Sequence, residues 1–110
     1  MNEQILKQEI NHMHASLCAA VADPHRIMII YELEKGPKYV GELAKAVDLS
    51  QSATSRHLKI LKSQDIVSSE RVGHYVTYTL HAPKLIQALN IFRAVLNDQL
   101  ERRANLINLE

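Results

Sequence analysis

Three side chains that bind metals or react with oxidants lie close together near the N-terminus: His12, His14 and Cys18. His14 and Cys18 are four residues apart, so an α-helix would place them on one face. This spacing can chelate a soft or borderline ion such as zinc, if Asp98 or Glu101 of a second chain supplies further ligands. The alternative is that Cys18 is a small buried residue and that both histidines are ordinary surface residues.

Cys18 is the only cysteine, so an intrachain disulfide is impossible. The thiol could still act as a redox sensor through an intersubunit disulfide or a mixed thiol modification, because its reactivity depends on thiolate formation and exposure. A single cysteine is also typical of chains that work in a reducing compartment. We therefore expect a cytoplasmic protein and consider a thiol sensor beside a metal site.

The sequence offers no convincing arrangement for catalysis, which needs a nucleophile and a base together in a cleft. Ser55 and His57 are two residues apart, so a helix points their side chains in different directions. Cys18 with His14 is the remaining pair, and no carboxylate nearby in sequence would orient the histidine. We expect that the protein is not an enzyme.

Length and composition indicate one globular domain over residues 1–110. The chain is 46% hydrophobic and 23% charged, which is ordinary for a globular protein. We expect no membrane span, because the apolar runs are short, and no signal peptide, because the polar start lacks a basic and then apolar pattern. A chain of this size buries a modest core and gains much from dimerisation.

The charge distribution says more than the net charge of +1. Residues 35–81 hold seven basic and four acidic side chains, whereas residues 1–34 hold two basic and five acidic ones. Attraction to phosphate would therefore act in the middle of the chain. The alternative is a random scatter of surface charge.

Apolar spacing predicts a long helix at each end of the chain, over residues 3–20 and 83–104. Both apolar stripes exceed what a small monomer needs to cover its core, which favours packing against a second copy. Between them, Asp23-Pro24 predicts a helix start with Asp as N-cap and Pro as the first helical residue. Gly36-Pro37 predicts the end of that helix.

Residues 40–63 show the pattern of two short helices joined by a tight turn, the helix-turn-helix. Ser50 ends the turn and is a good N-cap for the second helix. In this helix Thr54, Leu58 and Leu61 recur at i, i+4 and i+7 and should face the core. The other side is polar, with Ser52, Ser55, Arg56 and Lys59.

The period changes to two between residues 66 and 81. Val76, Tyr78 and Leu80 alternate with threonines, and Gly73 permits a hairpin turn. We expect a two-stranded ribbon, or wing, with a basic tip.

Several spaced groups in this region resemble the ArsR/SmtB family of winged-helix repressors. They are Ala22-Asp23-Pro24-His25-Arg26-Ile27, Gly41-Glu42-Leu43-Ala44, Leu49-Ser50-Gln51-Ser52, Ser55-Arg56-His57-Leu58-Lys59-Ile60-Leu61, Asp65-Ile66-Val67 and Arg71-Val72-Gly73-His74-Tyr75-Val76-Thr77-Tyr78-Thr79-Leu80. The resemblance implies a mainly α fold with a small β-hairpin, a winged helix-turn-helix of the order α-α-α-α-α-β-β-α. It also implies a homodimer that forms through the first and last helices.

In such a fold the second helix of the motif enters a DNA major groove, and the wing lies along the backbone or minor groove. Arg56 is the best candidate for a bidentate contact to guanine, and Gln51 could pair with adenine. The expected DNA-binding residues are Gln51, Ser52, Ser55, Arg56, His57 and Lys59 on the helix, with Arg71 and His74 on the wing. A homodimer should bind an inverted repeat. The alternative for each residue is a solvated helix face.

Members of this family release DNA when a metal, a thiol oxidant or another small signal binds. The family's two usual metal sites correspond here to residues that do not form them: Tyr39 and Gly41 for the first, and Ala82, Lys84, Val95 and Asp98 for the second, where only Asp98 could ligate. We therefore expect neither site. The group His12, His14 and Cys18 remains as the candidate for metal or redox sensing.

The sequence thus predicts a DNA-binding transcriptional regulator, a repressor released from its operator by a metal ion, a thiol-reactive species or another ligand. The alternative is a winged-helix module that binds proteins without reading DNA, since a fold does not determine a function. A DNA reader should keep Arg56, Lys59 and Arg71 exposed on one surface, whereas an interaction module would cover them.

Overall fold

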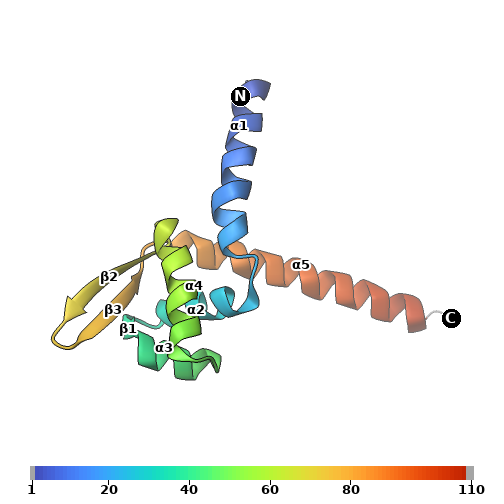
Figure 1. The fold of residues 1–110 in the computed structure, drawn as a ribbon. Coiled ribbons are helices and arrows are strands. Elements are labelled where there is room, and N and C mark those ends of the chain that lie inside the picture. Colours follow the sequence, from blue (N-terminus) through green and yellow to red (C-terminus); the bar gives the residue numbers. More distant parts are fainter. Residues whose placement is uncertain (1, 109–110) are drawn as a thin grey trace.

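The computed structural model describes residues 2–108 and confirms the winged helix-turn-helix (Figure 1). Its elements are α1 (Glu3–Met13), the π-helical segment η1 (His14–Cys18), α2 (Pro24–Glu34), β1 (Lys38–Tyr39), α3 (Val40–Val47), α4 (Gln51–Ser63), β2 (Val67–Val72), β3 (Tyr75–Leu80) and α5 (Pro83–Asn108). Five helical segments precede the hairpin, as predicted, when η1 is counted separately. The short strand β1 was not predicted, and α5 runs beyond the expected residue 104.

The helix expected over residues 3–20 is interrupted by η1. The backbone N–H of Ala19 donates to the carbonyl of His14, five residues earlier, which widens this turn. The Ser16 hydroxyl donates to the His12 carbonyl at 2.7 Å. The α-helical spacing assumed for His14 and Cys18 therefore does not describe this segment.

The predicted N-caps of α2 and α4 are present. The Asp23 carboxylate accepts hydrogen bonds from the backbone N–H groups of His25 and Arg26, at 2.8 and 3.4 Å. The Ser50 hydroxyl accepts from the N–H of Ala53 at 3.1 Å. Asp48, in the turn between α3 and α4, has φ +56°, a left-handed conformation that Asp tolerates better than most residues.

The core lies between the helix-turn-helix, α2 and the first turns of α5. As predicted, Thr54, Leu58 and Leu61 are fully buried on one side of α4. The Thr54 hydroxyl is satisfied there, because it donates to the Ser50 carbonyl at 2.8 Å. The apolar residues buried with them are Ala20, Ile29, Ile30, Leu33, Leu43, Val47, Ile66, Val67, Ile86 and Leu89.

The wing belongs to a three-stranded antiparallel sheet with the order β1-β3-β2. Strands β2 and β3 pair from Val67 opposite Leu80 to Val72 opposite Tyr75, and Gly73 adopts φ +63° in the turn. Strand β1 pairs Tyr39 with Thr77 and leads directly into α3. The wing is therefore tied to the helix-turn-helix at the start of its first helix.

The two terminal helices project from this centre (Figure 1). No residue of α1 is buried, and only Ile86 and Leu89 are buried in α5. The radius of gyration is 17.3 Å, whereas a compact domain of this length has about 13 Å. The accessible area is 8148 Å², against about 6,200 Å² for a folded monomer of this mass. The chain thus exposes roughly 2,000 Å² more surface than a compact monomer of its size.

Candidate nucleic-acid interface

One side of α4, here called its outer face, carries five exposed polar side chains: Gln51, Ser52, Ser55, Arg56 and Lys59. At 3.6 residues per turn these positions span about 140° of the helix circumference, centred opposite the buried Leu61 side. The buried residues of α4 fix the helix against the core, and the Ser50 cap stabilises its first turn. The outer face is therefore a rigid row of donors and positive charge.

The wing tip lies on the same surface as the start of α4. Gln51 and His74 line one shallow hollow together with Tyr39, Gly41 and Tyr75. The rings of Tyr39 and Tyr75 are in contact, with their centroids 4.7 Å apart. Arg71 and His74 are both exposed on the wing. The predicted helix and wing residues can therefore meet one elongated partner.

Gly41 allows this close arrangement. A Cβ atom at this position would lie 2.9 Å from Cε2 of Tyr39 and 3.4 Å from the side-chain nitrogen of Gln51. Any larger residue would displace the Tyr39 ring. Gly41, which the resemblance associated with an absent metal ligand, thus has a packing role between α3 and the wing.

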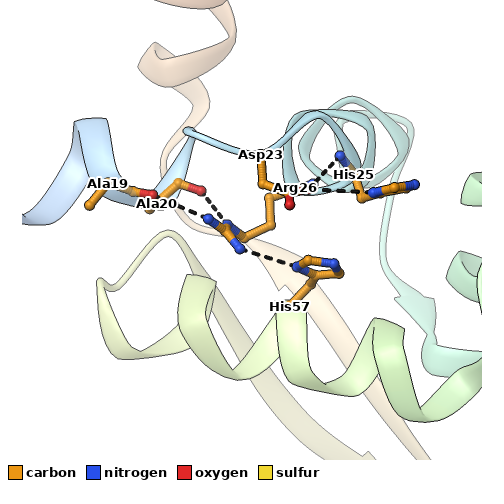
Figure 2. A network of polar contacts seen from close by, with 6 residues as sticks. All are labelled: Ala19, Ala20, Asp23, His25, Arg26 and His57. Atoms are coloured by element: carbon orange, nitrogen blue, oxygen red, sulfur yellow. Dashed lines mark hydrogen bonds and ion pairs between the residues drawn. The ribbon is translucent and has the colours of Figure 1, made fainter.

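His57 lies apart from the outer face, although it stands next to Arg56 in the sequence. It is half-buried, and its Nδ1 atom is 3.2 Å from Nη1 of Arg26 in α2 (Figure 2). A guanidinium group can only donate, so this contact uses the lone pair of Nδ1 of His57 as the acceptor. The structure therefore gives His57 a contact within the protein.

Arg26 connects three segments of the chain. Its Nε donates to the carbonyl of Ala20 at 2.6 Å, and its Nη2 donates to the carbonyl of Ala19 at 3.2 Å. Both carbonyls belong to the end of the N-terminal helical stretch. Together with the bond to His57, these contacts link that stretch, α2 and α4 at one guanidinium group (Figure 2).

Asp23 and His25 complete a cluster at this point, here called the junction cluster: Asp23, His25, Arg26 and His57. His25 stacks on His57 with ring centroids 5.8 Å apart, and its Nδ1 is 3.5 Å from Oδ1 of Asp23. Desolvation raises the pKa of Asp23, but backbone N–H donors from His25 and Arg26, together with electrostatic attraction from the side chains of His57 and Arg26, outweigh it, so its pKa is lowered. The carboxylate is therefore kept ionised.

The N-terminal candidates lie on the surface of the protomer. His12, His14 and Cys18 are all exposed on α1 and η1. Within residues 2–108, the single group of three side chains that could share a metal ion consists of Asp23, His25 and His57. Sequence analysis missed this group, because 32 positions separate His25 from His57 in the numbering and only the packing of α2 on α4 joins them.

Among the described residues, no helix has the length and apolar composition needed to cross a bilayer.

Comparison with known proteins identifies the family. The model of the bacterial regulatory protein arsR family matches residues 23–69. The nodulation protein NolR of Rhizobium meliloti is 34% identical over 92 residues, which cover 84% of this chain and 75% of NolR. The chain belongs to the ArsR family. The family expected from the sequence is thus confirmed. ArsR proteins are DNA-binding transcriptional regulators, a class distinct from enzymes.

Further relatives agree with this chain in sequence and fold. The transcriptional regulator NmtR of Mycobacterium tuberculosis is 37% identical over 76 residues, covering 69% of this chain but only 63% of NmtR. The crystal structure of NolR from Sinorhizobium fredii superposes with a TM-score of 0.73 at 32% identity, covering 86% of this chain and 93% of that one. The repressor BigR from Xylella fastidiosa gives 0.73 at 26% identity, covering 86% and 96%.

Proposed function

We propose that this ArsR-family chain is a homodimeric, cytoplasmic transcriptional repressor that reads an inverted-repeat operator and leaves it when a small signal binds. Each α4 enters a major groove, and each wing contacts the adjacent backbone or minor groove. The observation that carries the proposal is the outer face of α4, whose exposed polar row continues to the wing tip through the hollow shared by Gln51 and His74.

The residue types on this surface match what duplex DNA presents. Arg56 can donate two parallel hydrogen bonds to the O6 and N7 atoms of guanine, and Gln51 can pair in a similar way with adenine. Ser52, Ser55 and Lys59 suit phosphate oxygens, which fix the register of a protein on the duplex. Arg56, Lys59 and Arg71 are all exposed, which favours a DNA reader over a module that covers them with another protein.

Dimerisation is supported by the surface that the protomer leaves uncovered. Exposed apolar side chains follow both terminal helices: Ile5, Leu6, Ile10, Met13 and Leu17 on the first stretch, and Ile91, Phe92, Val95, Leu96 and Leu100 on α5. The surplus of roughly 2,000 Å² is comparable to the share that one protomer buries in a large obligate homodimer. Sedimentation at micromolar concentration should give a dimer, and a monomer would contradict this part of the proposal.

Selection of binding sites from a random duplex library tests the function without knowledge of the operator. The proposal expects enrichment of an inverted repeat whose half-sites lie about one helical turn, or a multiple of it, apart. Absence of any enriched sequence under low-salt conditions, where phosphate attraction is strongest, would reject specific DNA reading. That result would favour the alternative, a winged-helix module for protein interactions.

A further inference from the structure

The junction cluster contains a donor set of the kind that holds divalent transition metals. One ligand atom from each of Asp23, His25 and His57 lies within 4.8 Å of the other two. Two imidazoles and one carboxylate suit zinc, nickel or cobalt, with water in the remaining positions. We propose that these three residues bind such an ion, and that the ion displaces Arg26 from His57.

One of the three pairs of ligand groups already has the spacing of a metal site. Bonds of about 2.0–2.2 Å place the ligand atoms of a tetrahedral site about 3.3–3.6 Å apart. Nδ1 of His25 and Oδ1 of Asp23 are already separated by 3.5 Å. The side chains of His25 and Asp23 are 37% and 30% exposed, so an ion can reach them from solvent.

Asp23 is prepared for the role of an anionic ligand. Its Oδ1 accepts the capping hydrogen bonds from the backbone of α2, which hold the carboxylate beside Nδ1 of His25. These bonds fix the carboxylate relative to the helix and favour its ionised form. Helix capping explains why an Asp stands at this position, but it does not require the two histidines beside it.

An ion and Arg26 cannot both use His57. A neutral imidazole has one nitrogen lone pair available, and Arg26 takes it at Nδ1. If the ion binds Nδ1, that lone pair is occupied. If the ion binds Nε2, the ring proton moves to Nδ1, which then points an N–H group at another donor. Either way the contact with Arg26 is lost, whereas Arg26 keeps its bonds to Ala19 and Ala20.

Loss of the contact between Arg26 and His57 is the way in which the ion would affect DNA binding. Within the described residues, the Arg26–His57 contact is the one hydrogen bond between a side chain of α4 and residues 19–34. Its loss would uncouple α4 from the end of the N-terminal helical stretch and change how α4 is presented to DNA. This consequence rests on the proposed function, whereas binding of the ion does not.

Calorimetric titration of the full chain with zinc tests the site. Asp23→Asn removes the carboxylate but keeps a residue that caps helices as well as Asp does. His25→Ala removes an imidazole that, among the described residues, makes no hydrogen bond to Arg26. Binding of one ion per chain should weaken roughly tenfold or more in both variants. His14→Ala, which changes an exposed histidine of η1, is the matched control and should bind zinc like the parent.

Three results would overturn the metal site: no zinc binding by the parent, unchanged binding in both cluster variants, or binding lost only in His14→Ala. Thermal melting of the metal-free variants shows whether each is folded, so a loss of binding through unfolding is recognised. The regulatory step is tested separately on a selected DNA site. Zinc should weaken DNA binding by the parent about 5–150-fold but not by Asp23→Asn. If the metal-free parent binds no DNA, the proposed function fails, while calorimetry still decides the metal site.

Discussion

The two sides of α4 differ in the contacts that they make. On the outer face Arg56 and Lys59 point into solvent, ready for an external partner. On the inner side Leu58 is fully buried and His57 is bound to Arg26. Arg56 and His57 are neighbours in the sequence, but 100° of helix rotation separates their roles. The angle of a residue about the axis of α4 therefore decides whether it faces solvent or the rest of the protein.

The largest expected difference between the two sides is in stability. Leu58→Ala should lower the free energy of unfolding by about 2–5 kcal/mol, because it leaves a cavity in the core. Ile60→Ala is the matched control, because Ile60 is 41% exposed and has little to lose. Denaturant titration of both variants measures the difference. Equal losses would contradict the assignment of an inner and an outer side.

A smaller contrast is expected between His57 and Ser55. His57→Ala should cost about 1 kcal/mol of unfolding free energy, since a half-buried hydrogen bond to a charged group is lost. Ser55→Ala should change stability by less than about 0.5 kcal/mol, because its side chain is exposed. Thermal melting of the metal-free proteins compares the two. A greater loss in Ser55→Ala would show that the bond between Arg26 and His57 does not hold α4.

The smallest effect concerns Lys59 as a phosphate contact. Lys59→Ala should weaken binding about equally on all DNA sequences and lower the salt dependence of binding by about one unit of slope per contact. Fluorescence anisotropy over a series of salt concentrations measures this slope. An unchanged slope with altered sequence preference would make Lys59 a base contact instead.

Much of the helix-turn-helix could be predicted, because its signals are local. The Asp23 and Ser50 caps and the buried residues Thr54, Leu58 and Leu61 follow from spacing within one or two helical turns. The exposure of Arg56 and Lys59 follows from the same periodicity. The DNA contacts themselves stay predictions.

The features that sequence analysis missed depend on non-local contacts or on very short segments. Strand β1 has two residues, too few to show a period, and it exists through its pairing with β3. The π-helical turn η1 could not be predicted, because the apolar residues of the N-terminal stretch recur at the spacing of a continuous α-helix. The junction cluster joins His25 to His57 only through the packing of two helices. Each of these features could be recognised only from the three-dimensional structure.

The central claim, that the outer face of α4 reads DNA, is tested most directly by Arg56→Ala. On a selected inverted repeat this variant should lose roughly 1–3 kcal/mol of specific binding, while it keeps most of its affinity for unrelated duplex. Lys84→Ala removes one positive charge from an exposed site at the start of α5 and is the matched control. Gel-shift titration of the three proteins gives the result. Unchanged specific affinity in Arg56→Ala would contradict the claim.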